Sequence, residues 1–180
     1  MKKSKSGFTI VELAVVIVVI AILATIILVS YNRVQAQSRD ARRLSDVADI
    51  QKAMELYYSD NGVYPFETGS TGSAIDSSWY SSGDASWNKL KSKLTKAIDQ
   101  LPVDPKNKTN GRPYDSDGYA YGIFVTHNNE KYCGSADGMM YLIVYRLEIG
   151  GQKTKSDGTC ATKPVPASYS NGASTYLSVK

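Results

Sequence analysis

The side chain with the most unusual setting in this sequence is Glu12. It is the one charged residue between Phe8 and Val29, and this stretch contains neither Pro nor Gly. About 20 consecutive apolar residues are enough for a helix to cross the roughly 30 Å of hydrocarbon in a bilayer. A carboxylate within such a helix costs on the order of 2.5–3.5 kcal/mol even on the most lenient insertion scale. We therefore expect Glu12 to have a partner and a function.

The residues around Glu12 form a recognisable motif. A short leader with three lysines ends at Gly7, Phe8 follows, and Glu12 is the fifth residue of a chain that begins at Phe8. This pattern closely resembles the start of type IV pilins and of type II secretion pseudopilins. The resemblance implies that a prepilin peptidase cuts between Gly7 and Phe8 and methylates the new Phe8 amine. The alternative is an ordinary signal anchor with Glu12 near the lipid headgroups.

The same resemblance implies an assembly role, in which Glu12 pairs with the Phe8 amine of a neighbouring subunit. A buried carboxylate and a buried ammonium each lose hydration, and their pairing offsets part of that loss. The partners implied are copies of the same chain and other pilins in a helical filament, prepilin peptidase, an assembly platform with its ATPase, and the membrane before assembly.

The net charge of +4 comes mostly from the leader. Removal of residues 1–7 lowers the number of basic residues from 21 to 18, against 17 acidic residues. A nucleic-acid partner is therefore not expected from the overall charge. Basic residues flank the apolar run on both sides, so their count does not decide its orientation. The resemblance implies a cytoplasmic leader, an extracytoplasmic head, and finally a cell-surface filament (pilus).

The helix is predicted to continue beyond the membrane, because residues 30–58 also lack Pro and Gly. Its packed stripe is predicted from spacings of three and four residues: Ala41, Leu44, Val47, Ala48, Gln51, Met54 and Tyr58. Asn61-Gly62 is expected to end it. Many pilins carry a helix-breaking residue within the anchor, and this chain has none. We predict four segments: leader 1–7, transmembrane and filament-core helix 8–30, amphipathic extension 31–60, and head 61–180.

Three arginines stand on this extension at Arg39, Arg42 and Arg43. They could bind DNA or anionic lipid. Short charge clusters on helices more commonly form a solvated face or pair between subunits. From the sequence we favour a solvated face or pairing between subunits.

The predicted fold class of the head is α+β, with the long helix packed on a small antiparallel sheet, as in the pilin fold. Alternating runs rich in Tyr and Val predict strands at 118–126, 139–149 and 175–179, with one packed face. Residues 68–86 are predicted to form a surface loop containing Trp79 and Tyr80, followed by a short helix that Ser86 caps. A Leu-Pro-x-Asp-Pro run at 101–105 looks like that of the major pseudopilin of type II secretion.

Cys133 and Cys160 are the two cysteines. In an exported head a bridge between them is expected, although two reduced thiols remain the alternative. The resemblance implies the same bridge, because in many pilins a disulfide pins the C-terminal loop to the sheet.

No catalytic constellation, cofactor site or metal site is predicted. The single histidine, His127, has no nucleophile or metal-ligand set at a recognisable spacing. Three functions are compatible with the sequence, and the first is the one that we favour. The chain is a pilin of a type IV pilus, a pseudopilin of a secretion or competence system, or a monomeric membrane-anchored binding protein in which Glu12 would be dispensable.

Overall fold

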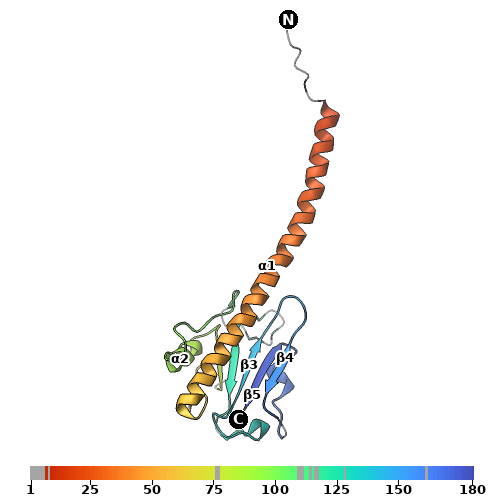
Figure 1. Cartoon of the computed structure of the whole chain (residues 1–180). Helices are drawn as coiled ribbons and strands as arrows, with labels where there is room; N and C mark the ends of the chain where they lie inside the picture. Colours follow the sequence, from red (N-terminus) through yellow and green to blue (C-terminus); the bar gives the residue numbers. More distant parts are fainter. Residues whose placement is uncertain are drawn as a thin grey trace. The chain divides into compact units, whose positions relative to one another are not determined.

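The computed structural model describes residues 7, 9–75, 78–108, 112, 113, 115, 118–127, 129–160 and 162–180, without the side chains of residues 27–29. It contains two compact units, Met1–Ser38 and Arg39–Lys180. The helix α1 (Ile10–Asn61) belongs to both units, and every other element belongs to the second (Figure 1). We refer to the second unit as the head.

In the first unit, α1 exposes its apolar side chains. Ile10 is 88% exposed, Leu13 61% and Ile17 59%. The hydroxyl of Thr25 donates to the carbonyl of Ile22 at 2.7 Å, so this polar group is satisfied within the helix. By length and composition, α1 is able to cross a membrane.

In the head, the buried stripe of α1 is rotated relative to the predicted one. Val47 and Met54 are buried as expected, whereas Ala48 is exposed and Ile50 is fully buried. The helix turns its larger side chains to the sheet because they remove more apolar area from water. The helix ends where expected, since the amide of Gly62 (φ 73°) donates to the carbonyl of Tyr58 at 2.7 Å.

The head contains a mixed sheet in the order β1-β2-β3-β5-β4. Its strands are β1 (Trp79–Ser81), β2 (Gly122–Val125), β3 (Met140–Tyr145), β4 (Thr154–Asp157) and β5 (Ser174–Val179). The antiparallel pairs β2–β3 and β3–β5 lie within the predicted strand ranges. The predicted α+β class, with a long N-terminal helix and a small sheet, is confirmed. The sheet is mixed and not antiparallel throughout, because β4 pairs with β5 in parallel. The polar sequence of β4 has no apolar alternation that could have revealed it.

Both faces of this sheet are packed, contrary to the predicted single packed face. One core cluster lies between α1 and the sheet and includes Ile50, Met54 and Ile143. A second cluster contains Phe124 and Leu142, with side chains from residues 160–169 against it. All six residues of β3 are buried for this reason. The C-terminal segment supplies a second cover that strand periodicity does not reveal.

The predicted surface loop at 68–86 is also partly wrong, because Trp79 and Tyr80 form part of β1 and are only 2% and 1% exposed. The following helix, α2 (Ser86–Lys93), has no side-chain cap from Ser86. The hydroxyl of Ser86 instead accepts a hydrogen bond from the amide of Ser81 at 2.9 Å. The carboxylate of Asp84 accepts from the amide of Ser86 at 2.9 Å. The N-cap position is held by Ala85, and Asp84 supplies the acceptor for the first amide of α2.

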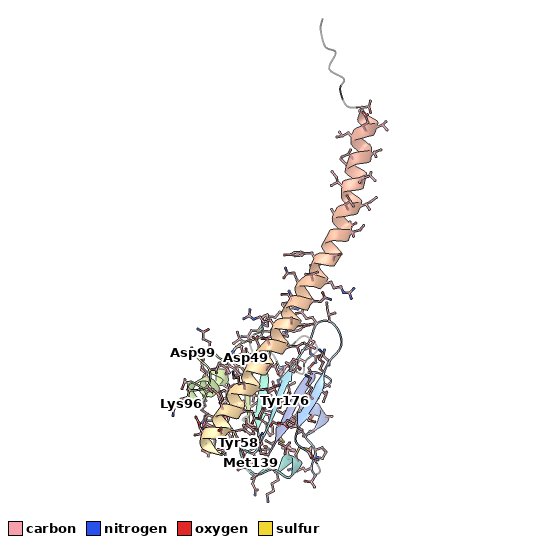
Figure 2. All side chains as sticks on the ribbon, in the orientation of Figure 1. Asp49, Tyr58, Lys96, Asp99, Met139 and Tyr176 are labelled. Carbon is pink, nitrogen blue, oxygen red and sulfur yellow. A yellow bond between two sulfur atoms is a disulfide. The ribbon has the colours of Figure 1, made fainter. Side chains whose placement is uncertain are left out.

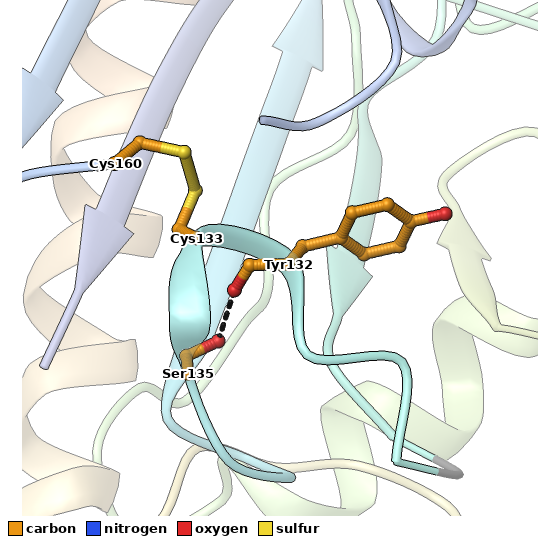
Figure 3. Close-up of a disulfide and its surroundings, with 4 residues drawn as sticks. All are labelled: Tyr132, Cys133, Ser135 and Cys160. Carbon is orange, nitrogen blue, oxygen red and sulfur yellow. Dashed lines mark hydrogen bonds between the residues drawn. A yellow bond between two sulfur atoms is a disulfide. The ribbon is translucent and has the colours of Figure 1, made fainter. Parts of the chain in front are cut away.

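The predicted disulfide is confirmed, since Cys133 and Cys160 are bonded with a Cα–Cα distance of 4.3 Å (Figure 3). The bridge ties the short helix η1 (Tyr132–Gly134) to the C-terminal segment that covers the second core cluster. The amide of Cys133 also donates to the carbonyl of Lys163 at 2.9 Å, which adds a second link at the same place.

Replacing Cys133 and Cys160 together by alanine is expected to lower the free energy of unfolding of the head by about 3–4 kcal/mol, because the bridge closes a loop between residues 27 apart. Denaturant titration of the full chain in detergent, followed by fluorescence, measures this directly, since both tryptophans lie in the head. The unreduced wild type provides the control. Alkylation of both thiols without prior reduction would contradict the prediction.

Candidate functional site

The N-terminal end of α1 carries the first candidate site. The carboxylate of Glu12 accepts two hydrogen bonds at Oε2, from the amide of Thr9 at 2.8 Å and from its hydroxyl at 2.7 Å. The amide of Glu12 in turn donates to the Thr9 hydroxyl at 3.3 Å. This reciprocal arrangement is a capping box, which satisfies donors at a helix start that would otherwise lack partners. Glu12 thus has an intramolecular partner in the single chain.

Thr9 was not singled out from the sequence, although the signal for it was present. Thr9-x-x-Glu12 directly before an apolar run has the spacing of a capping box. The family resemblance directed attention to a partner on another subunit and away from this local one.

The depth of Glu12 also follows from the helix. Helix α1 begins at Ile10, and Glu12 stands two residues further on, which is about 3 Å along the axis, whereas the uncharged residues after it extend to residue 29. A carboxylate at the edge of the hydrocarbon with two hydrogen-bond donors costs less than one at the centre.

The remaining residues of the predicted site are Gly7 and Phe8. Gly7 is exposed, and a Cβ added to it would meet no atom within 4 Å, so nothing described crowds the predicted cleavage point. Phe8 lies outside the described residues. Its predicted pairing with Glu12 of another subunit stays a prediction.

The second site is a cluster of charges inside the head, centred on Arg43, whose side chain is fully buried. Its guanidinium donates to Asp104 at 2.6 and 3.1 Å, to Asp40 at 2.8 Å, and to Glu148 at 2.7 Å. Arg39 adds two hydrogen bonds to Glu148 at 2.7 and 2.8 Å. We call this the Arg43 cluster: Arg39, Asp40, Arg43, Asp104, Lys106 and Glu148.

The cluster joins α1 to two loops of the head. Asp104 belongs to the Leu-Pro-x-Asp-Pro run, and Glu148 lies in the turn after β3. Asp40 also accepts hydrogen bonds from the amides of Glu148 at 2.9 Å and Ile149 at 2.8 Å. Although burial opposes its charge, the hydrogen bonds to the three carboxylates raise the pKa of Arg43. Three cations balance three carboxylates, so the buried charges neutralise one another.

This cluster corrects the interpretation of Arg39 and Arg43, whereas the exposed Arg42 agrees with the solvated face favoured from the sequence. Arg39 and Arg43 pair within their own head, so neither a DNA contact nor a pairing between subunits accounts for them. Only Arg42 is largely exposed, and it lies 3.7 Å from Asp46 one turn further along α1. Helical spacing alone could not show that Asp104 and Glu148, which are more than 60 residues away, would meet Arg43.

The cluster makes the stability of the head depend on pH. Hydrogen bonds from Arg39, and further ones from Lys106 and Arg43, hold the pKa of Glu148 well below its usual range. A depressed carboxyl pKa in the folded state adds stability above the unfolded-state pKa, and this is lost as the pH falls toward the folded-state value. Glu148→Gln should therefore cost stability above about pH 5 and progressively less between about pH 5 and 2. Denaturant titrations of both forms across this range test it, and a pH-independent difference would contradict it.

A metal centre has no support in the part of the chain that the structure describes, where no group of three or more potential ligands is suitably placed. His127 is 3% exposed, with its Nδ1 atom 3.5 Å from a carboxylate oxygen of Glu130.

Comparisons with known proteins agree with this picture. Residues 2–28 match the family described as the prokaryotic N-terminal methylation motif. The chain is 36% identical over 74 residues to the fimbrial protein EcpC of Eikenella corrodens, covering 41% of this chain and 48% of that protein. It is 31% identical over 78 residues to the type IV major pilin protein PilE of Neisseria gonorrhoeae, covering 43% and 47%.

A longer similarity links the chain to type II secretion system core protein G of Pseudomonas aeruginosa, at 27% identity over 113 residues, covering 63% of this chain and 73% of that protein. The chain otherwise spans about half the length of curated relatives such as EcpC, at 48%. No solved structure matches the chain. The methylation motif and these relatives show that the chain is similar to type IV pilins and type II secretion pseudopilins, and the fold agrees with this similarity.

Proposed function

We propose that this protein is a structural subunit of a type IV pilus filament and is not an enzyme. The observation that carries the proposal is the first half of α1. Its apolar side chains, such as Leu13 and Ile17, are about 60% exposed in the single chain, and one capped carboxylate stands at their start. Such a surface needs either lipid or other apolar helices around it. A filament core of bundled helices supplies these other apolar helices.

The proposed segments follow the expected processing. Prepilin peptidase removes residues 1–7 and methylates Phe8, residues 8–30 form the membrane and filament-core helix, residues 31–60 the amphipathic extension, and residues 61–180 the head. The head faces away from the cytoplasm. An assembly platform and its ATPase then extract the subunit into the filament, and the protein ends on the cell surface.

In this proposal Glu12 changes partner during assembly. In the membrane it is held by Thr9, and in the filament it pairs with the Phe8 amine of a neighbour. The exchange is plausible energetically because a charged ammonium is a stronger partner than a neutral amide and hydroxyl. The capping box therefore keeps Glu12 satisfied until the neighbour arrives.

A pseudopilin of a secretion system is the second candidate, and the similarity to core protein G over 63% of this chain favours it. A monomeric anchored binding protein is the third. In such a protein the carboxylate of Glu12 would have no function other than capping α1.

The proposal is tested by shearing the cell surface and examining the released material by electron microscopy and immunoblot. A pilus subunit should be the main protein of long sheared filaments. Recovery of the processed protein only in the membrane fraction would instead support the pseudopilin.

A further inference from the structure

One flank of the head carries several charges that form no ion pair with any other residue that the structure describes. A crease runs between α1 and residues 92–100 and consists of two adjoining hollows of about 570 and 410 Å³ that share Ala97. We call it the α1–α2 crease. Six charged side chains line it. Lys93 pairs with Glu67 at 3.2 Å, which leaves five others: Asp49, Lys52, Asp60, Lys96 and Asp99. All five are exposed, and none of them forms an ion pair within the described residues.

This contrasts with the rest of α1 in the head, where charges are paired. Arg43 and Asp40 are buried together, Arg42 lies near Asp46, and Glu55 pairs with Lys180 at 3.0 Å. Figure 2 shows the labelled Asp49, Lys96 and Asp99 on the α2 side of α1, whereas Tyr176 lies on the other side. Within the head part of α1, the charges without an ion pair among the described residues therefore lie along this crease.

The opposite flank ends in the edge strand β4. All four of its residues are exposed, and the preceding Lys153 is exposed as well. Lys153, Lys155 and Asp157 likewise lack an ion pair among the described residues. Figure 1 places α2 and β4 on opposite sides of the head. Two different surfaces on opposite flanks can join copies head to tail, which builds an open helical filament.

The order of charges on the two flanks agrees. Lys180 directly follows β5 and pairs with Glu55 near the end of α1, so β5 and α1 run in the same direction through the head. Strand β4 is parallel to β5 and therefore runs in this direction too. Along this direction the hollow of about 410 Å³ comes first, and its two acids, Asp49 and Asp99, outnumber its one base, Lys52. The hollow of about 570 Å³ follows, and its two bases, Lys93 and Lys96, outnumber its one acid, Asp60. The net charge along the crease therefore changes from negative to positive.

Along β4 the charges have the opposite signs to those of the crease, because the positive Lys153 and Lys155 come before the negative Asp157. The lengths also match, since Asp49 to Asp60 spans about 16 Å of helix and Lys153 to Asp157 about 13 Å of strand. In a helical filament all subunits point the same way. The charges of the crease and of β4 must therefore be complementary when both are followed in the same direction.

We propose that the α1–α2 crease receives the β4 edge of a second copy of this chain, with Asp49 and Asp99 facing Lys153 and Lys155, and Lys96 facing Asp157. This rests on the proposed function, because it describes how heads dock along the filament. Each exposed pair contributes little alone, about 0–1 kcal/mol, so the contact selects register and orientation while the apolar helices provide most of the attraction.

Thiol cross-linking tests the docking in assembled filaments. Both native cysteines are bridged, so introduced cysteines are the only free thiols. A chain with Thr95→Cys in the crease and Ser156→Cys on β4 should give a ladder of oligomers with a short thiol cross-linker. Each single variant should give almost none, because a head-to-tail contact joins two different surfaces. The matched control combines Ser156→Cys with Asn88→Cys, an exposed residue of α2 outside the crease.

Normal filaments of the first variant with no more cross-linking than the control would overturn the docking and leave the proposed function standing. Absence of filaments from the wild type would overturn both. A charge swap provides a second measurement in the same filaments. Asp99→Lys and Lys155→Asp should each reduce the ladder severalfold, and the double variant should restore it. Equal ladders in all three forms would contradict the pairing.

Discussion

Replacing Glu12 by alanine is expected to leave the protein in the membrane and to abolish filaments. The change removes the only charge in the apolar run and, in the proposed filament, leaves the Phe8 amine of the neighbour without a counter-ion. Removing one member of a buried ion pair typically costs about 3–5 kcal/mol. Since each 1.4 kcal/mol is about a tenfold change in an equilibrium constant, filament yield should fall by more than roughly a hundredfold.

Glu12→Gln is the informative companion variant, because it keeps an acceptor for the Thr9 amide and hydroxyl but carries no charge. If the capping box were the only role of Glu12, this variant would still assemble. We expect it to fail as the alanine variant does. Filament yield is measured by quantifying sheared protein against total membrane-inserted protein. Normal yield from either variant would refute the pairing of Glu12 with the amine.

Replacing Arg43 by methionine is expected to destabilise the head by about 3–5 kcal/mol, because it leaves Asp40, Asp104 and part of Glu148 without their shared cation in a buried site. This approaches the whole stability of many domains, which is about 5–15 kcal/mol. We therefore also expect a lower level of the protein in cells.

The matched control is Arg42→Met, one residue away on the same helix. The Arg42 side chain is 62% exposed and lies 3.7 Å from Asp46, so its loss should cost less than about 1 kcal/mol. Denaturant titrations of both variants in detergent, followed by tryptophan fluorescence, give the two values. Equal losses would show that the Arg43 cluster contributes no more than a surface pair.

The predictable parts of this protein are those in which a local pattern determines the structure. The apolar run with Glu12, the helix end at Gly62 and the position of β3 follow from local signals, and the structure agrees with each. The disulfide was predictable because the chain holds only two cysteines.

The features that escaped prediction depend on contacts between distant residues. Arg43 looked like a surface charge because nothing near it in sequence shows that Asp104 and Glu148 will enclose it. Strand β4 has no apolar side chain, so only its parallel pairing with β5 reveals it. Trp79 lies in a Ser-rich stretch, and its burial depends on the second core cluster. Thr9 is the exception, since its capping spacing was readable.

The most direct test of the central claim is the intact mass and N-terminal sequence of this protein purified from sheared surface filaments. The account predicts a chain that starts at N-methylated Phe8, lacks residues 1–7 and carries the disulfide between Cys133 and Cys160. A chain that starts at Met1, with no methyl group and no filament, would contradict it and would favour a plain signal anchor.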